Sequence, residues 1–434
     1  FLLCSGLSYV LCQLEADDEC REGACALHAL QTRSLVRSEA RSDEPSDEVK
    51  TSPYVRPKNH LDLHPNKFPI SSSCKKPPCS GQIHLQLGGP GEMVVSFVSQ
   101  PESDTKSRVR FGKGDLDVMD QEAIGQAEVY SQLIYWRADL WNPPLKGGYG
   151  LPQDIVAKDM STTSWASDER TGWKYPGTWK EVGTQQVESD HLGWYKNPGE
   201  RYDSPAIHTV VLADLQPGQT YKYQVENDDR IFEFTMPAEE AKYPYHVGLV
   251  GDVGQTPVSN SSMHLLSGLN PEVVLMTGDL AYADGYYPRW DSFGIMFETL
   301  AAKIPVMSCV GNHEYGEGES FKSYNARYPM PHAQSGSMDN TYWSRDIGPM
   351  HVIALNTYSQ TKPGSYQYKW LEKDLKSFSR KKTPWLVVIM HAPWYNSNLG
   401  HYGEAKVTHG DAPECFSLLV VLCSQALGVG LHKH

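Results

Sequence analysis

The chain has 434 residues, which exceeds the usual size of one hydrophobic core and predicts two or three domains. Its hydrophobic fraction of 40% is ordinary for a globular protein. Lysine and arginine number 39 against 52 acidic side chains, a formal charge of −13, so we expect no nucleic-acid-binding surface and no anionic-membrane surface.

The N-terminal segment has the features of a secretory leader. The chain begins without Met, and we expect that its true start is missing. Residues 1–14 are apolar enough for the core of a signal peptide but too short to span a bilayer.

Asn260 lies in one glycosylation sequon, Asn-Ser-Ser. Two close cysteine pairs suit small disulfide loops, Cys20/Cys25 and Cys74/Cys79. Together these features predict a secreted or endomembrane, for example vacuolar, protein without a stable membrane span; the alternative is an apolar stub of a longer tail.

Residues 1–66 are predicted to be this signal-like segment followed by a disordered linker. Residues 26–66 carry many charges and scattered prolines with poor apolar periodicity, and such a composition buries too little to offset ordering entropy. From about residue 80 the pattern changes to short alternating segments divided by Gly and Pro, such as EMVVSFVSQ and TYKYQVEND. This pattern is typical of antiparallel strands, and its architecture resembles a fibronectin-like β-sandwich within residues 67–240.

An interruption at residues 128–205 separates the two halves of this β-rich region. It carries six of the 11 tryptophans: Trp136, Trp141, Trp165, Trp173, Trp179 and Trp194. Because Gly, Pro and charges are mixed among them, a long ordered loop packed by aromatic side chains is favoured over a further domain. A face that stacks on sugars or bases is the alternative.

From residue 243 five apolar runs of strand length alternate with helical stretches such as PRWDSFGIMFETLAAK and YQYKWLEKDLKSF. Four of the five runs lead into a polar side chain: Asp252, Asp279, Asn312 and His391. A single such residue is often a helix cap. Four together supply hard oxygen donors and an imidazole, which are ligands for a cluster of Fe, Zn or Mn ions. The glycines before the first three let the backbone approach closely.

These residues resemble the purple acid phosphatases within the calcineurin-like metallophosphatase superfamily. The family motifs Gly-Asp-x-Gly, Gly-Asp-x-x-Tyr, Gly-Asn-His-Glu and Val-x-x-His match GDVG, GDLAY, GNHE and VIMH. Flanking stretches such as GPMHVIALNTYS and HAPWYNS are similar to the same family. The resemblance implies an α+β protein of two domains, in which the β-sandwich precedes an α/β metallophosphatase domain of four-layer αββα type at residues 243–434.

The resemblance also implies a binuclear metal centre. Asp252 and Tyr282 would hold Fe(III), the tyrosine as a phenolate, and Asp279 would bridge the two ions. Asn312 and His391 would hold a second, divalent ion, which is Zn, Fe or Mn.

Two further histidines match family positions that do not bind metal. His313 in GNHE and His401 downstream are expected to grip phosphate oxygens and to help protonate the leaving group. The family's final Gly-His-x-His motif is not recognisable, so the C-terminal part of the domain reads as incomplete. His432 and His434 in LHKH have the right mutual spacing, but the strand and Gly that should precede them are missing.

The sequence therefore predicts an acid phosphatase that hydrolyses small phosphate monoesters with a metal-activated hydroxide at an Fe(III)–M(II) centre. One alternative is a metallophosphoesterase acting on diesters or nucleotides. A second alternative, which the altered C-terminus favours, is a catalytically impaired binding protein with the same fold. A homodimer is left open.

Overall fold

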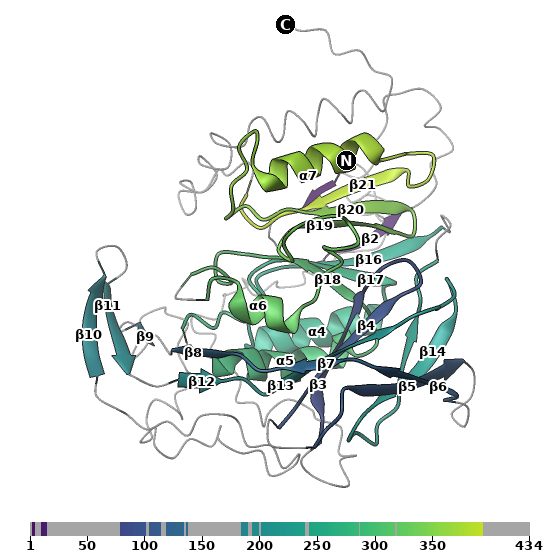
Figure 1. The fold of residues 1–434 in the computed structure, drawn as a ribbon. Helices are drawn as coiled ribbons and strands as arrows, with labels where there is room; N and C mark the ends of the chain where they lie inside the picture. The colour runs from purple at the N-terminus through teal and green to yellow at the C-terminus, as the bar shows by residue number, and fades with distance from the viewer. Residues whose placement is uncertain are drawn as a thin grey trace, which may run out of the picture.

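The computed structural model describes residues 2–4, 10–14 and 79–393, with gaps in the last range at 101–103, 114–118, 134–135, 138–183, 190–192, 199–200, 239–242, 286 and 317–318. A β-sandwich comes first in the chain, and a layered α/β part follows it (Figure 1).

The sandwich contains two four-stranded antiparallel sheets. The first has the order β3 (Gly81–Leu87), β4 (Met93–Ser99), β13 (Ala206–Leu212) and β7 (Gln126–Glu128). The second has the order β15 (Phe232–Thr235), β14 (Thr220–Val225), β5 (Arg108–Lys113) and β6 (Gln121–Ile124). In β14 every second residue is buried, because successive side chains of a strand point to opposite faces. The predicted β-rich N-terminal region is confirmed, while its fibronectin-like topology stays a prediction.

The second part has two sheets packed between helices. One sheet has the order β18 (Val306–Cys309), β17 (Val273–Thr277), β16 (Tyr245–Val250) and β2 (Val10–Leu14). The other has the order β1 (Leu2–Cys4), β21 (Trp385–Ile389), β20 (Met350–Ala354) and β19 (Trp343–Ile347). The helices are α4 (Pro257–Leu269), α5 (Pro288–Ala301), α6 (Lys322–Arg327) and α7 (Tyr366–Ser377). With α7 outside one sheet and α4 and α5 outside the other, the predicted four-layer αββα fold is confirmed (Figure 1).

Both ends of the signal-like segment pair with these sheets. Leu2–Cys4 runs parallel to β21, and Val10–Leu14 runs antiparallel to β16. The predicted linker lies outside the described residues. Cys79, at the start of the sandwich, is disulfide-bonded.

Most of the Trp-rich interruption also lies outside the described residues, so the prediction of one long ordered loop stays a prediction. Five strands belong to it or flank it: β8 (Ser131–Leu133), β9 (Trp136–Arg137), β10 (Thr184–Ser189), β11 (Gly193–Pro198) and β12 (Arg201–Asp203). The strands β10, β11 and β9 form a small sheet of their own, and β12 pairs with β8.

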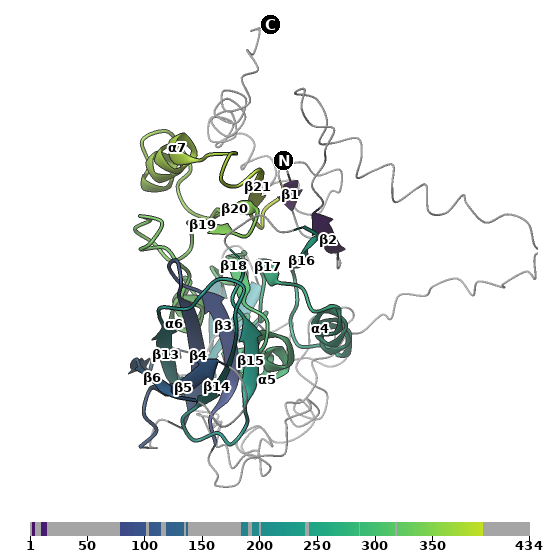
Figure 2. The same ribbon diagram turned by 90° about the vertical axis from the view of Figure 1, so that its right-hand side faces the viewer.

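A buried arginine joins the sandwich to the second part. Arg327, at the end of α6, donates to Gln82 Oε1 at 3.0 Å, to the Tyr202 hydroxyl at 2.8 Å and to Asp291 Oδ1 at 2.9 Å. Tyr202 in turn donates to Asp291 Oδ2 at 2.8 Å. Because a buried charge requires such partners, this network fixes how the sandwich lies against α5. Figure 2 shows α5 beside the strands of the sandwich.

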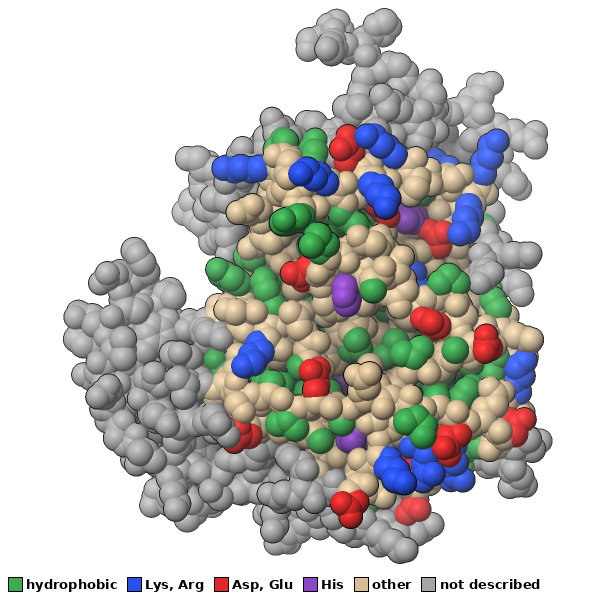
Figure 3. Space-filling model, viewed as in Figure 1, with side chains coloured by type: hydrophobic (Ala, Val, Ile, Leu, Met, Phe, Trp, Pro, Cys, Tyr) green, Lys and Arg blue, Asp and Glu red, His purple; other side chains and the backbone are tan. Residues whose placement is uncertain are grey.

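Charged side chains of both signs lie on the surface of the molecule. Acidic and basic side chains are interspersed on the face shown in Figure 3, although several basic ones lie over α7. Within the described ranges, no helix combines the length and the apolarity that a membrane span requires.

Candidate metal centre

Three predicted ligands come together where strands end. Asp252 follows β16, Asp279 follows β17 and His391 follows β21, and one ligand atom of each lies within 4.8 Å of the others. His391 Nε2 is 3.1 Å from Asp279 Oδ2. Because β16, β17 and β18 are parallel, their carboxyl ends meet at one edge, where open α/β sheets hold their ligands.

The other two predicted ligands join the same cluster. Asn312 Oδ1 lies 3.1 Å from His391 Nε2, and the Tyr282 hydroxyl donates to Asp252 Oδ1 at 2.9 Å. The structure thus brings all five predicted ligands to one place. Their carboxylate, phenol, amide and imidazole groups form a donor set that fits hard metal cations. That these residues bind metal stays a prediction.

The loops that carry these side chains have an unusual backbone. Asp252, Asp279 and Tyr282 have φ of 55°, 53° and 47°, a region that non-glycine residues rarely occupy. Such conformations cluster at functional sites, where the surrounding structure holds them. At Gly311 an added Cβ would overlap Asp279 Oδ1, so only glycine lets the loop after β18 approach the carboxylate.

Glu314 ties two of the loops together. Its buried carboxylate accepts from the backbone N–H groups of Asp279, Leu280 and Gly311, each at 2.8 Å. Burial raises the pKa of Glu314 to about 7. No role was predicted for this residue, because its hydrogen bonds from Asp279 and Leu280 join segments more than 30 residues apart.

The charges in the cluster are unbalanced. Burial raises the pKa of the Asp252 carboxyl above its usual range. Burial alone would lower the pKa of His391, but its hydrogen bond to Asp279 raises it to about 9. The protonated imidazole therefore neutralises part of the negative charge of both carboxylates. A metal cation would neutralise more of it.

His313 is held beside the cluster without being part of it. Its Nδ1 is hydrogen-bonded to Asp284 Oδ1, and its Nε2 lies 3.8 Å from Asp279 Oδ2. Its ring lies 4.2 Å from the Tyr282 ring, measured between centroids. Burial would lower the pKa of His313, but the hydrogen bond and charge of Asp284 raise it to about 9. Asp284, in the motif GDLAYAD, was not identified from the sequence.

The remaining predicted residues have different outcomes. His401, His432 and His434 lie outside the described residues. Asn260 lies in the first turn of α4 with its Oδ1 buried, and its glycosylation stays a prediction. Tyr358, which sequence reasoning missed, places its hydroxyl 3.4 Å from Asn312 Oδ1.

Phosphoesterases and purple acid phosphatases are among the known proteins that this chain resembles. Residues 245–417 match the family model of calcineurin-like phosphoesterases. Purple acid phosphatase 21 of Arabidopsis thaliana is 43% identical over 210 residues, which cover 47% of this chain and 48% of the relative. Purple acid phosphatase 23 of the same plant is 35% identical over 300 residues, 60% of this chain and 65% of the relative. A purple acid phosphatase of Glycine max is 36% identical over 283 residues, 60% of each chain.

A solved structure supports the fold. The purple acid phosphatase PPD1 from yellow lupin (Lupinus luteus) seeds matches with a TM-score of 0.50 and 19% identity, over 75% of this chain and 53% of that chain. The family match and the clustered strand ends show a calcineurin-like phosphoesterase domain at residues 245–417. Within that class the chain is similar to the purple acid phosphatases. The chain spans about half the length of the first relatives that it matches.

Proposed function

We propose that this protein hydrolyses small phosphate monoesters at a binuclear Fe(III)–M(II) centre. The observation that carries the proposal is the convergence of Asp252, Asp279 and His391 within 4.8 Å, with Tyr282 in contact with Asp252. Asp252 and Tyr282 would hold Fe(III), and Asp279 would bridge. Asn312 and His391 would hold a divalent Zn, Fe or Mn ion. When bound, the two ions supply Lewis-acid activation of water and neutralise the charge of the phosphate.

The residues of the chain supply the proton chemistry. Asp284 accepts from Nδ1 of His313, which orients the ring and stabilises its imidazolium form. His313 Nε2 is then free to donate to a phosphate oxygen or to the oxygen of the leaving alcohol. In this proposal His401, ten residues after His391 in the sequence, assists.

Two observations favour monoesters over diesters. The relatives named above are purple acid phosphatases, and Tyr282 occupies the position that the tyrosine of the family motif requires. Export from the cell agrees with the apolar segment at residues 1–14 and is part of the same proposal.

The test is a pair of chromogenic substrates, a phosphate monoester and the matching diester, assayed with the metal-reconstituted protein. Faster monoester hydrolysis, lost in Asp279→Asn, supports the proposal. Preferential diester cleavage would reassign the substrate class. Absence of both activities in a protein that holds two metal ions per chain would favour the impaired binding protein.

A further inference from the structure

A buried arginine contacts the loop that carries Tyr282, which we call the Tyr282 loop and which comprises residues 279–285. Arg289 lies in the first turn of α5, and only 1% of its surface is exposed. Its Nη1 donates to the Tyr282 carbonyl at 2.8 Å. The same nitrogen lies 3.8 Å from Asp284 Oδ2. Arg289 therefore holds both the main chain and a side chain of this loop.

These contacts are part of a closed ring of four residues. The two carboxylate oxygens of Asp284 are divided between partners, since Oδ1 contacts His313 Nδ1 and Oδ2 faces Arg289. The His313 ring packs against the Tyr282 ring, with 4.2 Å between the centroids. The Tyr282 carbonyl closes the ring at Arg289. A shift of Arg289 would therefore disturb the phenol and the imidazole together.

The backbone of the Tyr282 loop depends on such contacts. Tyr282 and Asp284 have φ of 47° and 51°, in the left-handed region that side chains disfavour. These conformations cost free energy and persist only where the surrounding structure holds them. Arg289 gives a charged hydrogen bond to the carbonyl of the first residue and a countercharge to the second.

Stability of the helix does not explain a cation at this position. The first turn of a helix carries a partial positive charge, which opposes the charge of Arg289. A buried ion pair also adds little net stability compared with apolar packing. The helix is fixed by other residues, because Trp290 is buried in the core and Asp291 Oδ1 accepts from Gln82 Nε2 of the sandwich at 3.2 Å. The contribution of Arg289 therefore lies in what it positions.

We propose that Arg289 is a positioning residue that clamps the Tyr282 loop to α5. The clamp fixes the Tyr282 carbonyl and the Asp284 carboxylate before any ion or phosphate arrives. The phenol of Tyr282 is then preorganised for the proposed Fe(III), and the imidazole of His313 is preorganised for the phosphate. The clamp belongs to the metal-free fold, and only its purpose rests on the proposed function.

Hydrogen–deuterium exchange of the metal-free full chain measures the clamp directly. Arg289→Met should speed amide exchange in a peptide covering residues 279–285 by about 10–100-fold, because a charged hydrogen bond to the loop is lost. Arg230→Met is the matched control, since its guanidinium is also largely buried and pairs with Asp228 and Glu298, outside this loop. The control should exchange in the Tyr282 loop at the wild-type rate.

Arg289→Lys guards against misfolding of Arg289→Met. The lysine keeps a buried cation, but its ammonium group ends nearer to α5. This variant should fold like wild type and still speed exchange of the Tyr282 loop, by less than Arg289→Met does. The proposal is overturned if loop exchange is unchanged in both Arg289 variants, if Arg289→Lys exchanges faster all along the chain, or if Arg230→Met loosens the loop equally.

Chelator competition links the clamp to the proposed iron site. Starting from equal iron content, the Arg289→Met variant should lose its visible band at a chelator concentration about 10–100-fold below that for wild type. Arg230→Met should retain iron like wild type. Wild-type retention of iron despite a loosened loop would overturn the preorganisation of Tyr282. A wild-type chain that takes up no iron would refute the proposed function instead, and the exchange measurement would still decide whether the clamp exists.

Discussion

Asp284, which lies five residues after Asp279 in the sequence, accepts a hydrogen bond from Nδ1 of His313. The contact fixes the orientation of the imidazole and leaves Nε2 facing the cluster. Asp284→Asn should therefore lower the monoesterase kcat by about 10–100-fold, as the loss of an orienting partner does elsewhere. Its metal content should be unchanged, and its pH profile should shift because the imidazolium loses its countercharge. Asp120→Asn, at an exposed position, is the control. Equal losses of metal and activity would make Asp284 a purely structural residue.

Tyr282 should give the protein its colour. If its phenolate binds Fe(III), the protein absorbs visible light by charge transfer, and Tyr282→Phe abolishes that band. Tyr358→Phe removes a hydroxyl next to Asn312 and should leave the band in place. Visible spectra recorded at equal iron content test this prediction. An unchanged spectrum for Tyr282→Phe would refute Tyr282 as a ligand of Fe(III).

His313 should matter more to turnover than to metal content. His313→Ala should lower kcat by about 10²–10⁴-fold if the imidazole transfers a proton. Bound metal, measured by elemental analysis, should remain near two ions per chain. Metal loss in proportion to activity would show instead that His313 maintains the ligand set.

His351 should make stability depend on pH. Its Nδ1 lies 2.6 Å from Asp346 Oδ1 and its Nε2 lies 2.9 Å from Asp374 Oδ2. Burial would lower the pKa of His351, but these carboxylates raise it to about 9, above the unfolded value of about 6.5. The stabilisation is therefore complete below about pH 6.5 and is lost as the pH rises through about 9.

The corresponding variant is His351→Gln, compared with wild type by thermal unfolding between pH 6 and 10. At pH 6 it should cost about 1–3 kcal/mol, because two carboxylates lose a charged partner. The difference should shrink towards pH 10. Lys382→Ala removes a mostly exposed partner of Asp346 and should cost less than about 1 kcal/mol. A pH-independent difference for His351→Gln would contradict the role of its charge.

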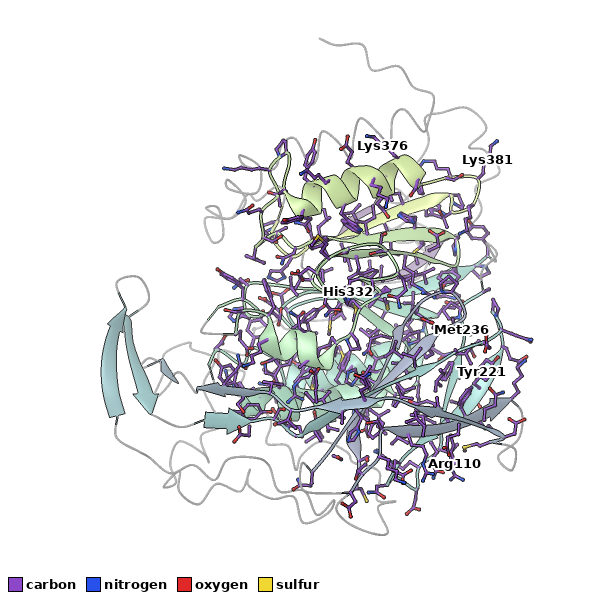
Figure 4. All side chains as sticks on the ribbon, viewed as in Figure 1. Arg110, Tyr221, Met236, His332, Lys376 and Lys381 are labelled. Atoms are coloured by element: carbon purple, nitrogen blue, oxygen red, sulfur yellow. The ribbon has the colours of Figure 1, made fainter. Side chains whose placement is uncertain are left out.

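Arg327 should be needed for the junction between the sandwich and the α/β part. Arg327→Met leaves Asp291 buried without its cation and should cost about 3–5 kcal/mol in free energy of unfolding. Arg110→Met, on the exposed side of β5 (Figure 4), should change stability by about 0.5 kcal/mol at most. Denaturant titration measures both, and equal effects would show that the buried network contributes little.

The strands and the ligand cluster were predictable because their signals are local. The apolar run PWLVVIMH contains β21 at Trp385–Ile389, and its last residue is His391 in the cluster. Helix α4 was not predicted, although its start carries a readable signal. Thr256 and Ser259 form a reciprocal capping box with Pro257 between them.

The residues that orient the cluster could not be predicted because they act across long separations. Nothing near Glu314 in the sequence shows that it accepts from Asp279 and Leu280. Glu319 is similar, since burial raises its pKa to about 8 and its hydrogen-bond donor Trp290 lies 29 residues away. Such roles depend on packing between elements and not on the pattern within one.

The three N–H bonds that converge on the Glu314 carboxylate work as a crosslink between the segments carrying Asp279 and Asn312. The crosslink is made by the polypeptide alone, so the two segments should keep their spacing with or without the proposed ions. Chelation should then empty the site without melting it, and ions should return without a refolding step. Metal exchange at the proposed site should then be limited by dehydration and entry of the ion.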